Sequence, residues 1–145
     1  MVFAMGRMLA LDVGAKRIGL AVSDEAGMGA TPLYAIERGR AADDAQKIAV
    51  VAAAHDVERI VIGLPLDIEG REGAAAQRVR RFAGALQGKT DLPLVFWDER
   101  LSTAEAEALL LEADMSRKKR KGRVDALAAA RILYSYLRAR EREEE

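Results

Sequence analysis

Two short apolar runs separated by a four-residue turn open the chain, and they constrain its fold more than any other feature. Residues 8–13, MLALDV, and 18–23, IGLAVS, each have the length and composition of one strand, and the intervening GAKR is a tight-turn sequence. We therefore expect the two strands to pair as an antiparallel hairpin. A third, weaker strand is expected over 30–37, where Pro32 favours the edge of the sheet because proline has no amide proton to donate.

Helical and strand patterns alternate along the rest of the chain. The clearest buried strand is RIVIGL, residues 59–64, and another follows at 93–97. The expected helices are 41–55, 72–87, 102–112 and 124–140. Strands that alternate with helices pair in parallel. The sequence therefore predicts an α/β protein in which a mixed five-stranded sheet is flanked by helices in three layers.

The length and the ends of the chain indicate one domain. A chain of 145 residues without internal repeats or linkers builds a single core, so residues 1–145 are interpreted as one domain. Because Met8 is an alternative start, residues 1–7 are expected to form an N-terminal extension, and residues 141–145, EREEE, an acidic tail. The sequence has no cysteine, no export signal and no apolar stretch of the roughly 18 residues that span a bilayer, so we expect a cytoplasmic protein that does not cross a membrane.

The charges sum to zero but are segregated along the chain. The segment 116–123, SRKKRKGR, carries six basic residues and no acid, and four glutamates follow Arg140. Such a basic run binds the phosphates of a nucleic acid or is only a solvated loop. We favour phosphate contact, to which Lys16 and Arg17 in the hairpin turn are expected to contribute. The basic residues of the run are Arg117, Lys118, Lys119, Arg120, Lys121 and Arg123.

An aspartate stands in the first apolar run, where a core residue is expected. Asp12 has apolar neighbours on both sides, and a desolvated carboxylate costs several kcal/mol (about 3–5) unless it is paired or bound to a metal. The structural alternative is an aspartate at a strand end that caps the turn at Gly14. We favour a functional carboxylate.

Two further acids close the fifth strand. Asp98 and Glu99 directly follow PLVFW, and successive strand residues point to opposite faces of a sheet. Only one of the two can therefore share a face with Asp12, and the other would support the site or pair with Arg100. The alternative is an ordinary polar strand exit before a capped helix.

The last candidate acid, Asp125, begins the final predicted helix. It lies on one helical stripe with Ala129, Ile132 and Tyr136, so its carboxylate is expected on the face that packs against the sheet. A favourable interaction with the helix dipole would explain an acid at this position, but not its inward direction. Convergent carboxylates bind hard cations, and two Mg²⁺ or Mn²⁺ ions about 4 Å apart would suit phosphodiester hydrolysis. The predicted metal ligands and catalytic residues are Asp12, Asp98, Glu99 and Asp125.

Four segments together resemble the YqgF/RuvX family in order and spacing. They are LALDVGAKRIGLAVSD, VIGLPLDIEG, WDERLSTAEAE and KGRVDALAAARILYSYL, and the resemblance extends from about Met8 to Leu137. It implies a ribonuclease H-like fold. It also places the acidic positions of the family on Asp12, on the motif Asp98-Glu99-Arg100, whose arginine would contact nucleic acid, and on Asp125.

The resemblance implies a metal-dependent endonuclease that hydrolyses phosphodiester bonds in Holliday junction DNA, in the 5′ end of precursor 16S ribosomal RNA, or in both. A homodimer would match the two-fold symmetry of a junction. The alternative within the family is a nucleic-acid-binding ribosome-assembly factor with little cleavage activity. An ATP-binding protein of the actin type also opens with an aspartate-containing strand, but that architecture needs two such domains and this chain supplies one.

Overall fold

The computed structural model describes residues 6–101 and 126–144, with the side chains of 126–141. The predicted helix 102–112, the basic run 117–123 and Asp125 lie outside the described residues. The elements are β1 (Arg7–Val13), β2 (Arg17–Ser23), β3 (Ala30–Glu37), α1 (Ala41–Ala54), β4 (Val57–Leu64), α2 (Ala74–Gln87), β5 (Leu94–Asp98), the 3-10 turn η1 (Glu99–Leu101) and α5 (Leu127–Glu144).

The five strands form one mixed sheet in the order β3-β2-β1-β4-β5. The first three strands are antiparallel neighbours, whereas β1 pairs with β4 and β4 with β5 in parallel. β3 is an edge strand, as Pro32 predicts, and its register with β2 shifts next to this proline. The predicted hairpin and parallel pairing are therefore confirmed.

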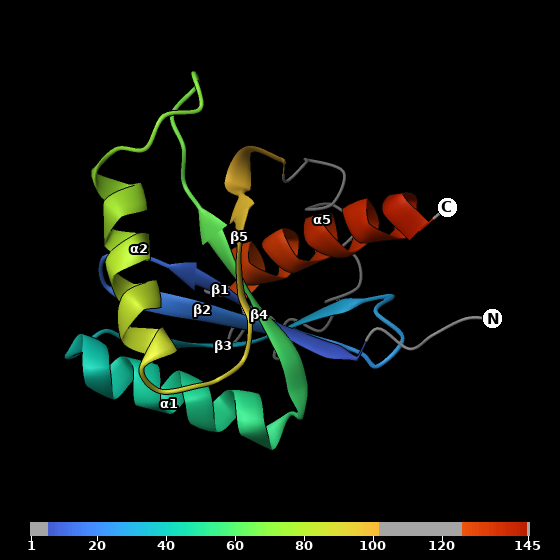
Figure 1. Cartoon of the computed structure of the whole chain (residues 1–145), viewed down its shortest axis with the longest axis horizontal. Helices are drawn as coiled ribbons and strands as arrows, with labels where there is room; N and C mark the ends of the chain where they lie inside the picture. Colours follow the sequence, from blue (N-terminus) through green and yellow to red (C-terminus); the bar gives the residue numbers. More distant parts are fainter. Residues whose placement is uncertain (1–5, 102–125, 145) are drawn as a thin grey trace, which may run out of the picture.

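Helices cover both faces of the sheet, so the predicted three-layer architecture is confirmed. α1 and α2 lie on one face and α5 crosses the other (Figure 1). The strand β1 divides its side chains between the two layers, because alternate residues point to opposite faces. Leu9 and Leu11 pack with α1 and α2, whereas Met8 and Ala10 pack with α5. This alternation directs Asp12 towards the layer of α5.

Several element boundaries differ from the sequence prediction by one to four residues, and two of the differences concern the predicted ends of the chain. β1 begins at Arg7, so the expected N-terminal extension already contains the first residue of the sheet. The backbone of α5 continues to Glu144, through most of the expected acidic tail, because glutamate and arginine are both good helix formers. None of the described helices is long and apolar enough to cross a membrane.

A buried ion pair, which the sequence analysis did not identify, fastens the hairpin turn beside Asp12 to the helical layer. Asp44 is fully buried, and its carboxylate accepts hydrogen bonds from Arg38 Nε at 3.2 Å and from the Gly39 amide at 3.1 Å. Arg38 also donates to the Gly14 carbonyl at 3.1 Å and lies over the ring of Phe82. The turn at the end of β1 is thus held by α1 and α2.

Candidate active site

Asp12 and Glu99 meet at the edge of the sheet where the parallel strands end. Asp12 is the last residue but one of β1, and Glu99 directly follows β5. Their side chains are hydrogen-bonded to each other. The carboxyl edge of an α/β sheet is where such proteins commonly bind ligands.

Strand alternation explains why Glu99, and not Asp98, joins Asp12. Val95 and Trp97 on β5 pack with the layer of α5, whereas Phe96 packs with the layer of α1 and α2. By this alternation Glu99 lies on the same side as Val95 and Trp97, facing α5, and Asp98 lies on the same side as Phe96. The sequence analysis left the choice between these two acids open, and the structure brings together Asp12 and Glu99.

The two carboxyl groups strongly influence each other's protonation. Burial raises the pKa of Glu99 to about 7, and the negative charge of Asp12 and the hydrogen bond to it act in the same direction. Burial also raises the pKa of Asp12, although the hydrogen bond from Glu99 and the charge of Arg131 oppose this rise. The hydrogen bond therefore favours a proton on Glu99 and a charge on Asp12 near neutral pH.

Arg131 on α5 is a member of this site that the sequence analysis missed. Its positive charge favours the ionised forms of both Asp12 and Glu99. The available signal was an arginine inside the apolar stretch LAAARILYSYL. An arginine in such a stretch faces either solvent or a buried acid, and spacing alone does not separate these cases.

Gly63 on β4 provides the space in which Glu99 lies. A side chain at this position would place its Cβ 2.7 Å from Glu99 Oε1 and would also overlap Ile132 of α5. The sequence signal was a glycine in the apolar run RIVIGL, which often marks a close approach to a strand. The sequence analysis did not assign Gly63 to the site.

Asp98 and Arg100 form a separate ion pair beside the half-buried Asp12 and Glu99. Arg100 Nη2 donates to Asp98 Oδ2 at 2.7 Å, and the Arg100 amide donates to Asp98 Oδ1 at 2.9 Å. These bonds hold the pKa of Asp98 below its usual range. Arg100 Nη1 also donates to the Ile68 carbonyl at 3.2 Å. Arg100, predicted to contact nucleic acid, thus links Asp98 to the loop that follows β4.

The remaining predicted residues divide into two groups. Lys16 in the turn between β1 and β2 and Arg17 at the start of β2 are exposed, at the same edge of the sheet as Asp12. The others lie outside the described residues: Arg117, Lys118, Lys119, Arg120, Lys121, Arg123 and Asp125.

The chemistry of the Asp12 and Glu99 pair suits a hard divalent cation. A proton on Glu99 relieves the repulsion between the two carboxyl groups. A divalent cation can take the place of this proton and bind the carboxylate oxygens of both residues. Within residues 6–101 and 126–141, no three histidine, cysteine or acidic side chains gather closely enough to hold a metal ion. The pair could therefore supply two ligands. Of the other two predicted ligands, Asp98 is paired with Arg100 and Asp125 lies outside the described residues.

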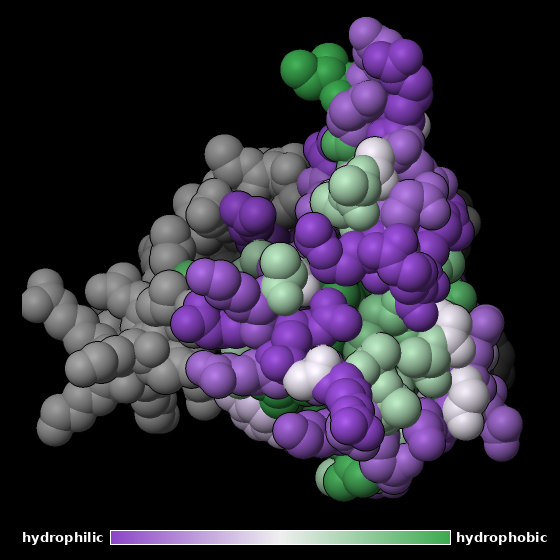
Figure 2. Space-filling view, turned by 90° about the vertical axis from the view of Figure 1, so that its left-hand side faces the viewer, coloured by the Kyte–Doolittle hydropathy of each residue, from purple (hydrophilic) through white to green (hydrophobic). Residues whose placement is uncertain are grey.

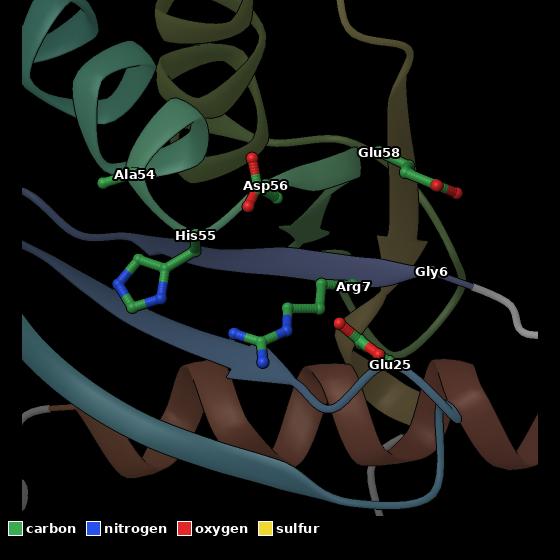
Figure 3. A pocket seen from close by; sticks show the side chains of 7 residues that line it. All are labelled: Gly6, Arg7, Glu25, Ala54, His55, Asp56 and Glu58. Carbon is green, nitrogen blue, oxygen red and sulfur yellow. The ribbon is translucent and has the colours of Figure 1, made fainter.

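A polar hollow of about 370 Å³ lies at the opposite end of the sheet. Its lining includes Arg7 at the start of β1, His55 at the end of α1, and the side chains of Glu25, Asp56 and Glu58 (Figure 3). It is remote along β1 from Asp12 and contributes nothing to the carboxyl pair. His55 is therefore not part of the candidate active site.

Comparison with known proteins identifies a family that covers almost the whole chain. The family described as RuvX, Holliday junction resolvase, matches residues 6–139. A relative from Halothermothrix orenii is 45% identical over 131 residues, which are 90% of this chain and 94% of the relative. A relative from Carboxydothermus hydrogenoformans is 47% identical over 131 residues, which are 90% and 95% of the two chains. Both carry the name "Putative pre-16S rRNA nuclease".

Solved structures support the fold. Thermus thermophilus RuvC in complex with a Holliday junction substrate superposes with a TM-score of 0.61 at 16% identity, over 93% of this chain and 96% of that chain. The fowlpox virus Holliday junction resolvase gives a TM-score of 0.56 at 11% identity, over 92% and 99% of the two chains. The ribonuclease H-like fold is therefore confirmed, and the sequence match shows that the chain belongs to the RuvX (YqgF) family.

Proposed function

We propose that the protein is a metal-dependent endonuclease that hydrolyses phosphodiester bonds in structured nucleic acid. The substrate is a four-way DNA junction, the 5′ end of precursor 16S ribosomal RNA, or both. The observation that carries the proposal is the half-buried, hydrogen-bonded pair of Asp12 and Glu99 at the carboxyl edge of the sheet, with a pKa of about 7 on Glu99. The family description and the names of the relatives support the same class of reaction.

In this proposal Asp12 and Glu99 would hold Mg²⁺ or Mn²⁺ and Asp125 would complete the ligand set, whereas Asp98, paired with Arg100, would support the site from its side. Bound divalent cations lower the pKa of a water and neutralise the charge that develops on a phosphodiester. Glu99 must lose its proton before it binds a cation. Because its pKa is about 7, this proton is released, and the cation can bind, around neutral pH. Arg131 favours that deprotonated form.

Basic residues at the carboxyl edge of the sheet bind the phosphates of the nucleic acid. Lys16 and Arg17 are exposed next to Asp12 and contact the phosphates on one side of the scissile bond. The run from Arg117 to Arg123 adds further phosphate contacts. Binding that depends on such contacts weakens steeply as salt rises. A homodimer would present two such sites to the two strands cut in a junction.

The test is a cleavage assay with a labelled four-way DNA junction and with a precursor 16S ribosomal RNA 5′-end fragment. Each is incubated with Mn²⁺, Mg²⁺ or EDTA. Wild type is compared with Asp12→Asn and with Asp43→Asn, an exposed acid in the first turn of α1. We expect metal-dependent cleavage that Asp12→Asn abolishes and Asp43→Asn retains.

Salt-sensitive binding without cleavage of either substrate would contradict the nuclease. That result would favour the assembly-factor alternative. Equal cleavage by wild type and Asp12→Asn would remove Asp12 from the reaction.

A further inference from the structure

The loop between β4 and α2 presents an isoleucine to solvent beside the candidate active site. Ile68 is 95% exposed, the highest value among the large hydrophobic side chains of the described residues. The loop rises beyond the carboxyl edge of the sheet (Figure 1), and Figure 2 shows the protrusion as mainly hydrophilic with a hydrophobic group at its tip. A single exposed apolar residue is ordinary on a protein surface. Ile68 differs from such residues because it lies beside the candidate active site and because hydrogen bonds hold its loop in place.

The loop is closed by its own hydrogen bonds. Asp67 Oδ1 accepts from the amides of Glu69 at 2.9 Å and Arg71 at 2.8 Å. The backbones of Asp67 and Arg71 are also paired, and Leu66 forms a β-bridge with Glu72. Ile68 therefore stands at the tip of a fixed turn, and its exposure does not result from a loosely held backbone.

Arg100 fastens this turn to the active-site edge. Its guanidinium binds the Ile68 carbonyl and, at the same time, the Asp98 carboxylate. Gly70, which has a φ of +84°, allows the close approach, because a Cβ there would lie 3.3 Å from Arg100 Nη2. Arg100 directly follows Glu99, so the place of Ile68 is set relative to the carboxyl pair.

The charges around the tip are paired within the protein. Arg71 binds both Asp67 and Glu69, and Glu72 binds Arg80. The loop therefore offers its partner an apolar contact at Ile68 in place of a row of cations. An apolar side chain cannot bind phosphates, and within nucleic acid its natural contact is the face of a base.

We propose that Ile68 is a wedge that inserts against an unstacked base next to the scissile phosphate, and that Arg100 is the positioning residue that holds it there. The proposal rests on the proposed nuclease function. In a continuous duplex both faces of each base are stacked, so a wedge of this kind selects nucleic acid with a branch point or an unpaired step. The loop thereby favours structured substrates over regular duplex.

The test measures base unstacking independently of cleavage. A four-way DNA junction and the precursor ribosomal RNA fragment carry 2-aminopurine at the branch point or beside the 5′-end cut, and are bound in Ca²⁺. Wild type is compared with Ile68→Ser and with Met28→Ser, a control at an exposed turn on the opposite edge of the sheet. We expect a fluorescence rise on binding that Met28→Ser retains and Ile68→Ser loses, with about fivefold weaker binding, the loss expected for one apolar contact.

Arg100→Lys separates positioning from phosphate binding. Lysine keeps the charge but cannot bind Asp98 and the Ile68 carbonyl together. We expect the fluorescence rise at saturating protein to fall as it does for Ile68→Ser, with the salt dependence of binding unchanged.

The wedge would be overturned if the fluorescence of the saturated complex rose equally with wild type and with Ile68→Ser. It would also be overturned if wild type bound both probes without any rise in fluorescence. Absence of binding to both probes would overturn it as well. A fluorescence rise without cleavage in Mg²⁺ would support the wedge while contradicting the nuclease, so the two failures are distinguishable.

Discussion

The raised pKa of Glu99 leads to a specific expectation for folding stability. In the folded protein this pKa is about 7, against an ordinary value of 4.5. Between these two pH values the folded state holds a proton that the unfolded state releases, so the free energy of unfolding falls as the pH rises. The difference corresponds to about 3 kcal/mol at about 1.4 kcal/mol per pKa unit. Solvent screening of the half-buried side chain lowers the expected change to about 2 kcal/mol.

Urea unfolding from pH 4.5 to 8 in EDTA measures this change. Wild type should lose about 2 kcal/mol of unfolding free energy across the range, and Asp12, whose pKa is also raised, should add to the loss. Glu99→Gln cannot titrate, so its decline should be smaller by the contribution of Glu99. Asp98→Asn is the matched control, because the pKa of Asp98 is lowered and its titration lies below this range.

Two results would refute the reasoning. One is an unfolding free energy of wild type that stays constant from pH 5 to 8. The other is a decline in Glu99→Gln as steep as in wild type. Either would mean that Glu99 is ionised in the folded protein without a penalty, and that the pair does not share a proton.

Four further outcomes follow from the same geometry. Mn²⁺ should raise the thermal midpoint more at pH 8 than at pH 5, because it competes with the proton on Glu99; an equal rise at both pH values would contradict this. Gly63→Ala should lower the cleavage rate about 100-fold by displacing Glu99, and a rate near wild type would show that Glu99 moves without consequence. Asp44→Ala should cost about 3 kcal/mol in urea unfolding because it leaves Arg38 without its buried partner, and a loss below about 1 kcal/mol would argue against the ion pair. Replacing Lys16 and Arg17 by alanine should reduce the slope of log binding constant against log salt by about 2, and an unchanged slope would exclude them from phosphate contact.

Most of the fold followed from local patterns in the sequence. The apolar runs at 8–13 and 18–23 and the buried run at 59–64 all became strands, and the edge position of Pro32 followed from its missing amide proton. These features depend on neighbouring residues alone. The ends of the elements were less predictable, because the start of β1 and the end of α5 depend on pairing and helix continuation that composition does not specify.

The candidate site was predictable only in part. An acid inside an apolar strand marks Asp12 from sequence alone, but the selection of Glu99 over Asp98 required the alternation of β5 against α5. The contribution of Arg131 depends on how α5 packs across the sheet. The buried pair of Arg38 and Asp44 was missed for the same reason, since each residue by itself has the sequence environment of an ordinary surface charge.

The location of the bound metal tests the central claim most directly. Crystals of the wild-type protein soaked in Mn²⁺ at pH 8 would reveal the ion by its anomalous scattering. We predict a peak within coordination distance of the carboxylates of both Asp12 and Glu99, and its loss in Asp12→Asn. A peak elsewhere, or none in crystals of a protein that cleaves nucleic acid in Mn²⁺ solution, would contradict the assignment of these two residues as the centre of the reaction.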